Sequence, residues 1–402
     1  MTGPSTVDET VRTRSIIICC GSGGVGKTTT AAAFGLQAAR LGRKACVVTI
    51  DPARRLANSL GLDQLTNHPT RIDGEWPGEL HALMLDPKGT FDDLILRYSD
   101  SPEQVEDIKQ NRIYRNLTGS LSGTQEYMAM EKLYELVDGG EFDLVVVDTP
   151  PTRNALDFLD APRRLTHFLG NRVFQALMKP TRAGLKFMGV AAQALLRTIA
   201  KVAGADIVQD AVAFFQAFEG MEEGFRERAL RVREMLGDEG TAFVLVASPR
   251  PDSVEEAVHF AGKLAESDLA VTALVVNRVQ PRFVDDHRLD TLVALAGTAG
   301  TAGTGGTAGT AGTAGGSGGP TATERPLDGL IANLAGFTAA SDREERAYAD
   351  LVASVAPAPV SRVPLLNGDV HDLAGLAEVA DLLFDGGDGP GGGPVGGDPP
   401  GR

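Results

Sequence analysis

Residues 16–30 read IIICCGSGGVGKTTT, and this stretch decides the fold. A short apolar run enters a glycine-rich turn, and an alanine-rich segment leaves it. Gly21, Gly26, Lys27 and Thr28 fit the P-loop spacing G-x-x-x-x-G-K-[ST]. Glycines let backbone N–H groups surround phosphate oxygens without a side chain in the way. A glycine-rich turn that binds nothing is the alternative, but a strand before it and a helix after it favour a nucleoside triphosphate site.

Each polar residue of this turn has a distinct expected task. The helix that begins near Lys27 directs the positive end of its dipole at the phosphates. Lys27 itself can reach the β- and γ-phosphates, and the Thr28 hydroxyl can ligate Mg²⁺. The pattern therefore predicts a phosphate-binding loop with a metal-binding hydroxyl.

Composition limits the remaining possibilities. The chain has 402 residues, a net charge of −15 and a hydrophobic share of 43%. The negative charge argues against a general nucleic-acid-binding surface. The three cysteines, Cys19, Cys20 and Cys46, fall in apolar runs, so we expect buried free thiols. No signal peptide or integral membrane segment is evident, and we expect a cytoplasmic protein.

Apolar runs alternate with helical patterns along most of the chain. Strands are predicted at 15–20, 44–50, 80–85, 142–147, 241–247, 271–276 and 360–366, and helices at 27–41, 91–137 (broken at 119–123), 252–266, 343–355 and 373–384. Continuous apolar strands separated by helices indicate an α/β fold with a mostly parallel sheet covered on both faces.

Composition shifts divide the chain further. The predicted parts are a loose tail at 1–13, a first core part at 14–160 with a helical excursion at about 91–137, a helical subdomain at 161–236, a second core part at 241–384 with a flexible Gly/Ala/Thr insertion at 296–319, and a disordered Gly/Pro-rich tail at 385–402.

The helical subdomain carries an apolar stripe. Leu185, Met188, Ala192 and Leu195 recur every three or four residues, and Phe225 belongs to a second stripe further along. A helical cap that packs on the sheet explains the pattern most simply. A groove for an apolar partner helix is the alternative.

Two carboxylates follow predicted strands. Asp51 and Asp148 should both emerge at the carboxyl edge of the sheet beside the P-loop. One is expected to hold the Mg²⁺ shell and the other to position the attacking water. Either could instead be a helix N-cap, but two such residues beside a P-loop favour a functional role.

An ordered set of motifs accompanies the P-loop: GSGGVGKTT at 21–29, TIDPA at 49–53, DTPPT at 148–152, SP at 248–249, VN at 276–277 and VPLL at 363–366. With this set the chain resembles the arsenite-pump (ArsA-like) and tail-anchored-protein-targeting ATPases, which are deviant P-loop NTPases. The matches run from residue 15 to about residue 384. The P-loop alone is shared by many families, whereas the ordered set is specific.

The resemblance implies a doubly wound sheet with an inserted helical subdomain, ATP and Mg²⁺ as ligands, and a dimer with nucleotides at the shared face. It implies that Asp51 orients the hydrolytic water and that Asp148 lies in the second shell of the metal ligated by Thr28. Asn277 would recognise adenine, with the backbone near Pro364 closing over the ring. The residues implied to bind nucleotide are Gly21, Gly23, Gly24, Val25, Gly26, Lys27, Thr28, Thr29, Asn277 and Pro364.

The chain departs from the pattern of this family in three respects, at Ser22, at the arginines of its switch segments and in its cysteines. Ser22 stands where family members carry a lysine that reaches the partner's nucleotide. Either an arginine near the switch segments (Arg54, Arg55 or Arg153) restores the charge, or a lysine-bearing paralogue completes the site in a heterodimer. The metalloid- and zinc-binding cysteines of relatives are also absent, which argues against arsenite sensing.

The resulting hypothesis is an Mg²⁺-dependent ATPase that couples nucleotide state to a protein or membrane client, with a hydrophobic client at the helical subdomain. Two alternatives remain open. The first is a weakly hydrolysing ATP-binding subunit of a heterodimer, and the second is a positioning or partitioning ATPase.

Overall fold

The computed structural model describes residues 6–50, 55–112, 114–115, 124–150, 210, 213–214, 216–217, 221–301, 326–366 and 368–384 of the 402. Several predicted features lie outside these residues: Asp51, Arg54, Arg153, the apolar stripe at 185–195, most of the Gly/Ala/Thr insertion and the C-terminal tail. The fold and the site below are built from the described residues.

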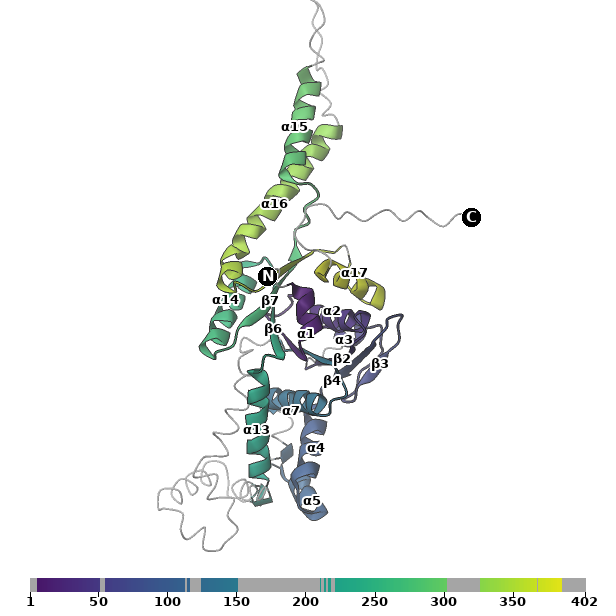
Figure 1. The fold of residues 1–402 in the computed structure, drawn as a ribbon, viewed down its shortest axis with the longest axis vertical. Coiled ribbons are helices and arrows are strands. Elements are labelled where there is room, and N and C mark those ends of the chain that lie inside the picture. Colours follow the sequence, from purple (N-terminus) through teal and green to yellow (C-terminus); the bar gives the residue numbers. More distant parts are fainter. Residues whose placement is uncertain are drawn as a thin grey trace, which may run out of the picture.

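An eight-stranded sheet forms the centre of the molecule (Figure 1). Its strands are β1 (Ile16–Cys20), β2 (Lys44–Thr49), β3 (Thr70–Ile72), β4 (Glu79–Met84), β5 (Leu144–Asp148), β6 (Thr241–Ala247), β7 (Val271–Val279) and β8 (Val360–Pro364). The order is β3-β4-β2-β5-β1-β6-β7-β8, and every neighbouring pair is parallel except β3 with β4. The mostly parallel α/β sheet predicted from the sequence is confirmed.

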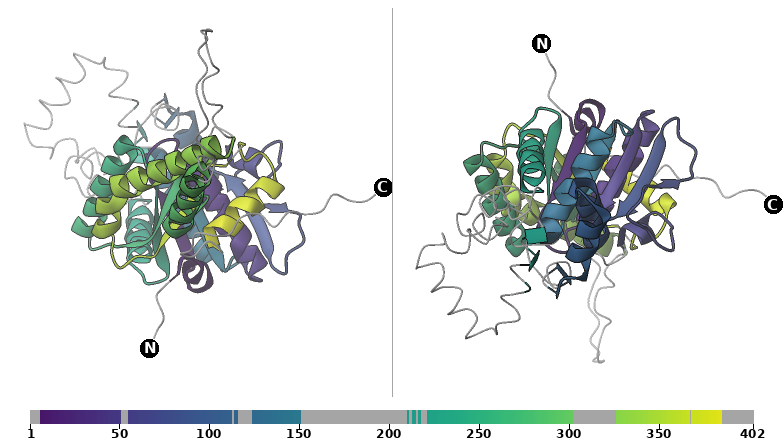
Figure 2. Two further views of the ribbon diagram at one scale, coloured as in Figure 1. Left: turned by 90° about the horizontal axis from the view of Figure 1, so that it is seen from above. Right: turned by 90° about the horizontal axis from the view of Figure 1, so that it is seen from below.

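Helices cover both faces of the sheet, as the views along the long axis show (Figure 2). One face packs against α1 (Val7–Thr13), α2 (Lys27–Arg40), α3 (Arg55–Ser59) and α17 (Leu373–Phe384). The other packs against α4 (Pro87–Tyr98), α5 (Pro102–Gln110), α7 (Thr124–Asp138), α13 (Glu222–Leu236), α14 (Pro251–Glu266) and the end of α16 (Pro326–Ser354). Side chains alternate between the faces, so Ile17 joins the first core and Ile18 the second. Burial on both faces explains why the strands read as continuous apolar runs.

The order of the strands brings the site together. β5 lies between β1 and β2, so the end of β5 is flanked by two other strand ends. Asp148 pairs with Cys19 on one side and with Thr49 on the other. Because these strands are parallel, their carboxyl ends share one edge of the sheet, where the P-loop also begins.

The N-terminal segment corrects one prediction. Residues 1–13 were expected to be a loose tail, but Val7–Thr13 form helix α1. Thr6 caps the helix, since its side chain accepts a hydrogen bond from the N–H of Glu9. Val7 and Val11, four residues apart, are buried on one face. Two apolar side chains were too weak a pattern to predict the helix from the sequence.

Helices α15 (Asp286–Thr301) and α16 form an arm that projects away from the sheet (Figure 1). The predicted flexible insertion began at residue 296, but α15 continues through Thr301, so its start is helical. At the base of the arm, the rings of Phe283 and Phe337 contact each other edge to face at 5.3 Å. Among the described residues, no helix has the length and apolarity needed to cross a membrane.

Helices α7 and α13 lie on the opposite side of the molecule from the arm (Figure 1). They are joined by a buried ion pair in which Arg228 Nε lies 2.7 Å from Glu131 Oε2. Phe225, the described residue of the predicted second apolar stripe, is buried and contacts the rings of Phe91 and Tyr98. At this residue the stripe is core, as the simpler interpretation expected.

Candidate functional site

The P-loop turns tightly between β1 and α2. Gly21 and Gly26 have φ values of 149° and 98°, which residues with a side chain rarely adopt. A Cβ on Gly21 would lie 2.0 Å from the carbonyl oxygen of Val246, and one on Gly26 would lie 2.2 Å from Nδ2 of Asn277. Glycine is therefore required at both positions, because β6 and β7 press against the loop.

Lys27 is held inside the loop. Its side chain belongs to the first residue of α2 and is only 6% exposed. The ammonium group donates a 2.8 Å hydrogen bond to the carbonyl oxygen of Ser22. The lysine thus folds back across the turn and places its charge at the mouth of the P-loop.

Asp148 accepts two hydroxyl hydrogen bonds at the bottom of the site. Its Oδ2 receives one from Thr28 at 2.7 Å and one from Thr49 at 2.9 Å. The carboxylate is 1% exposed. Since both hydroxyl protons are directed at the carboxylate, the lone pairs of Thr28 Oγ1 are available to a ligand above them. Oxygen donors of this kind suit Mg²⁺, so the residues fit the predicted metal.

A cavity of about 130 Å³ opens above these residues, and we call it the phosphate cavity. Its lining is Gly24, Gly26, Lys27, Thr28, Thr29, Arg55, Thr149 and Arg278. The lining brings together five residues predicted from the P-loop and adds three from other segments, Arg55, Thr149 and Arg278. Three cations around one small cavity favour a polyanion such as a triphosphate.

Two of these three residues come shortly after the ends of neighbouring strands. Thr149 comes directly after β5, and its hydroxyl donates a 2.8 Å hydrogen bond to the carbonyl oxygen of Cys19. Arg55 begins α3, shortly after β2. Three arginines were predicted as replacements for the missing lysine, and Arg55 is the one that lies within the described residues.

A larger cavity of about 420 Å³ lies on the outer side of the P-loop, and we call it the outer cavity. It is lined by Ser22, Gly23, Gly24, Val25, Ser248, Pro249, Arg250, Pro251, Asp252, Ser253, Glu256, Arg278 and Glu344. The hydroxyl of Ser22 donates a 3.1 Å hydrogen bond to Oγ of Ser253, which also accepts one from the N–H of Ser248. Ser22 is therefore tied to its own chain and supplies no charge.

Asn277 and Pro364 line neither cavity. The Asn277 amide donates a 2.7 Å hydrogen bond to the carbonyl oxygen of Val25 and accepts one from the N–H of Arg278. Pro364 ends the next strand, β8, where it pairs with Val279. Asn277 thus braces the P-loop, and its predicted contact with adenine stays a prediction.

Arg278, Thr49 and Ser253 are site residues that the sequence alone does not predict. Arg278 follows Asn277 directly, but an arginine after a strand is a common surface residue. Thr49 precedes Asp51 in the TIDPA motif, although its hydrogen bond depends on the pairing of β2 with β5. Only the strand order makes these residues neighbours of the P-loop.

Comparison with known families agrees with this geometry. A family model described as anion-transporting ATPase matches residues 14–292, which is more than half of the chain. The chain belongs to this family. The match extends from the start of β1 through the arginine-bearing end of β7 and into α15. It confirms the family resemblance and the ATPase predicted from the sequence.

Curated relatives of this anion-transporting ATPase family member are of modest identity. ATPase GET3 of Malassezia globosa is 26% identical over 279 residues, which cover 69% of this chain and 76% of that protein. ATPase GET3 of Podospora anserina is 27% identical over 261 residues, covering 64% and 71%. The ATPase ASNA1 homolog of Dictyostelium discoideum is 30% identical over 162 residues, covering 40% and 46%.

Proposed function

We propose that this chain binds ATP with Mg²⁺ and hydrolyses the bond between its β- and γ-phosphates. The observation that carries the proposal is the hydrogen bond from Thr28 to the buried Asp148, directly below a cavity that also holds Lys27. The family match supports the same conclusion.

The phosphates would occupy the phosphate cavity. An anion bound there would meet the backbone of the P-loop and the N-terminus of α2, and Lys27 adds a full positive charge. When a nucleotide arrives, the Lys27 ammonium exchanges the Ser22 carbonyl for phosphate oxygens, which are stronger acceptors because they are charged.

Thr28 would ligate Mg²⁺, with Asp148 behind it. The Asp148 carboxylate accepts the Thr28 proton and so fixes the direction of the hydroxyl lone pairs. Thr49 holds the same carboxylate oxygen from the other side. When bound, the metal neutralises charge that develops on the β- and γ-phosphate oxygens.

Asp51 is our proposed residue for orienting the attacking water. It lies outside the described residues, but the chain leading to it is anchored: the N–H of Ile50 donates to the carbonyl oxygen of Asp148 at 3.3 Å. Asp51 follows Ile50 directly in the sequence, which supports this role. Adenine recognition by Asn277, with Pro364 above the ring, is likewise part of the proposal.

Substitution of Lys27 tests the proposal. Lys27→Ala removes the charge at the mouth of the loop and is expected to abolish Mg²⁺-ATP binding and phosphate release. Lys44→Ala is the matched control, because Lys44 pairs with Glu79 and Glu141 at the other end of the sheet. Hydrolysis at the unmodified rate by the Lys27 variant would refute the phosphate site.

We also propose that the chain works as a dimer, either with itself or with a paralogue that carries the lysine missing at Ser22. The Ser22 hydroxyl is bonded to Ser253 within the chain, which supports a charge supplied from elsewhere. Native mass measurement with and without ATP and Mg²⁺ distinguishes the two. Slow turnover that rises when a lysine-bearing relative is added supports the heterodimer, and brisk turnover by the isolated dimer excludes it.

Coupling to an apolar client is the final part of the proposal. Strand β5 and helix α13 border the segment 151–220 in the sequence, and the buried ion pair between Arg228 and Glu131 joins α13 to α7, which packs on the sheet. Leu195→Glu within that segment is expected to prevent client association while ATP binding and thermal stability persist. Loss of stability together with ATP binding would make the stripe core instead.

A further inference from the structure

Arg278 stands at the boundary between the two cavities of the site. It lines the phosphate cavity with Lys27 and Thr28, and it lines the outer cavity with Ser22. Apart from Gly24, it is the only residue that the two linings share. The side chain is exposed, and no carboxylate among the described residues lies within ion-pair distance of it. Its charge is therefore available to an anion.

The backbone of Arg278 is held in an unusual conformation. Its φ is 62°, in the left-handed region that L-residues with side chains rarely enter. The Asn277 side chain stabilises this conformation by accepting a 2.9 Å hydrogen bond from the Arg278 N–H. Outliers of this kind occur preferentially at ligand sites, where the surrounding structure enforces them. Arg278 lies near the end of β7, where the pairing with β8 shifts register between Asn277 and Val279.

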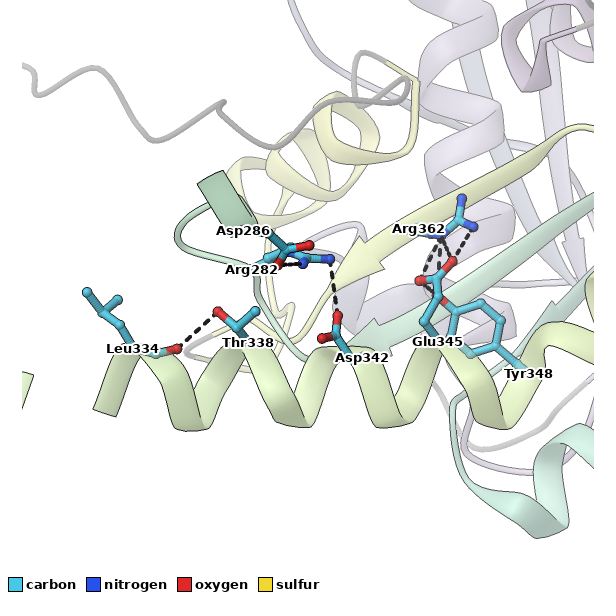
Figure 3. A network of polar contacts seen from close by, with 8 residues as sticks. All are labelled: Arg282, Asp286, Leu334, Thr338, Asp342, Glu345, Tyr348 and Arg362. Atoms are coloured by element: carbon cyan, nitrogen blue, oxygen red, sulfur yellow. Dashed lines mark hydrogen bonds and ion pairs between the residues drawn. The ribbon is translucent and has the colours of Figure 1, made fainter. Parts of the chain in front are cut away.

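Helix α16 contacts the chain that follows Arg278, and Figure 3 shows one of these contacts, between Arg282 and Asp342. The N–H of Gln280 donates a 2.6 Å hydrogen bond to Oε2 of Glu344, and Arg282 pairs with Asp342 at 3.3 Å. One turn further along α16, Glu345 pairs with Arg362 of β8 at 2.6 Å. The segment that carries Arg278 is thus anchored before and after it, which limits the positions that its guanidinium can reach.

We propose that Arg278 is a phosphate-binding residue that supplies positive charge to the nucleotide bound in its own chain. This inference rests on the proposed ATP site and adds a residue to it. The charge enters from the end of β7, on the side of the P-loop where Ser22 offers none. A planar guanidinium with several donors is suited to phosphate oxygens.

Arg250, the other arginine of the outer cavity, does not fit this role. Its guanidinium already makes two bonds to Asp252, at 3.2 Å and 2.7 Å. It also lines only the outer cavity. The charge of Arg250 is therefore partly neutralised and more distant from Lys27 and Thr28.

The test measures binding of a non-hydrolysable ATP analogue with Mg²⁺ at low and at high salt. Arg278→Gln is expected to weaken binding by about tenfold, the lower part of the range for charge-assisted hydrogen bonds because the side chain is exposed. The variant should also show a smaller dependence of the dissociation constant on salt. The affinity of Arg278→Lys should lie between those of the unmodified chain and Arg278→Gln. Arg288→Gln, a change at an exposed arginine of α15, is the control expected to bind as the unmodified chain does.

Arg278→Gly separates binding from folding. Glycine adopts φ of 62° without strain, so this variant should melt at least as high as the unmodified chain while losing ATP affinity as Arg278→Gln does. That combination supports the proposal.

Three outcomes would overturn the inference. If the unmodified chain binds the analogue and Arg278→Gln binds it equally, only Arg278 is excluded and the ATP site stands. If Arg278→Gly and Arg278→Gln lose stability and affinity together, with an unchanged salt dependence, Arg278 is structural. If the unmodified chain does not bind ATP at all, both this inference and the proposed function fail.

Discussion

The hydroxyl of Thr28 donates a 2.7 Å hydrogen bond to Oδ2 of Asp148, a residue 120 positions away. The bond joins the start of α2 to the end of β5, so it connects the phosphate-binding loop to the strand that ends at the second motif. Thr49 donates to the same oxygen from β2. Two hydroxyls on one carboxylate permit a matched comparison.

Thr28→Val and Thr49→Val should differ in their effect on Mg²⁺. Each removes one hydrogen bond to Asp148, which is expected to lower stability by about 1 kcal/mol. Only Thr28 faces the phosphate cavity, so only its variant should need a higher Mg²⁺ concentration for half-maximal ATP turnover. Titrations of Mg²⁺ on both variants check this, and identical curves would contradict the metal role of Thr28.

Asp51→Asn should separate nucleotide binding from hydrolysis. The amide keeps the shape of the side chain but loses the carboxylate proposed to orient water. Turnover is expected to fall by about 10²- to 10³-fold, while ATP affinity stays within a few fold. Asp63→Asn, at an exposed position in the same region of the chain, serves as the control. Parallel loss of affinity and turnover would make Asp51 structural.

Gly26→Ala and Gly42→Ala should differ although both glycines have positive φ, 98° and 83°. The strain of an L-residue in this region costs about 1–2 kcal/mol at either site. At Gly26 the new Cβ would also meet Asn277 Nδ2 at 2.2 Å, whereas nothing lies within 4 Å at Gly42. Calorimetry with an ATP analogue should therefore show lost affinity for the Gly26 variant alone.

Arg228→Ala should destabilise the connection between α7 and α13. The change leaves Glu131, which is 1% exposed, without its cationic partner. A broken buried ion pair costs about 3–5 kcal/mol. Arg226→Ala, which removes an exposed pair with Glu223, should change the free energy of unfolding by less than about 0.5 kcal/mol. Chemical denaturation of both variants measures the contrast.

The three cysteines should resist alkylation in the folded protein. Cys19, Cys20 and Cys46 are free and buried, as predicted from the sequence. Burial raises the pKa of Cys20 and Cys46 from 9.0 to about 12. Thiolates, the reactive form, are therefore rare at neutral pH. Rapid modification by iodoacetamide without denaturant would contradict the burial.

The same shifts predict how stability depends on alkaline pH. The folded-state pKa values lie above the unfolded ones, so the unfolded chain releases these protons first as pH rises. The contribution of these two protonated thiols to the free energy of unfolding is complete below about pH 9 and is lost between about pH 9 and 12. Cys46→Ala should flatten the fall of the unfolding free energy across that interval, which denaturation at several pH values can measure.

Local sequence was sufficient for the P-loop, the buried strands and the ATPase class. The P-loop is contiguous, and its glycines and Lys27 act through backbone geometry that depends on neighbouring residues. The apolar runs identified strands because both faces of a parallel sheet are buried. The position of Asp148 at a strand end followed from the same pattern.

The remaining features depended on contacts between distant segments. The position of β5 between β1 and β2 joins Thr28 and Thr49 to Asp148, and no local pattern specifies strand order. Helix α1 owes its order to two buried valines that meet the core only in the folded chain. Nothing in the sequence distinguishes Arg278 from an ordinary surface arginine. It reaches the phosphate cavity because Asn277 and α16 hold its backbone in a conformation that an isolated chain would rarely adopt.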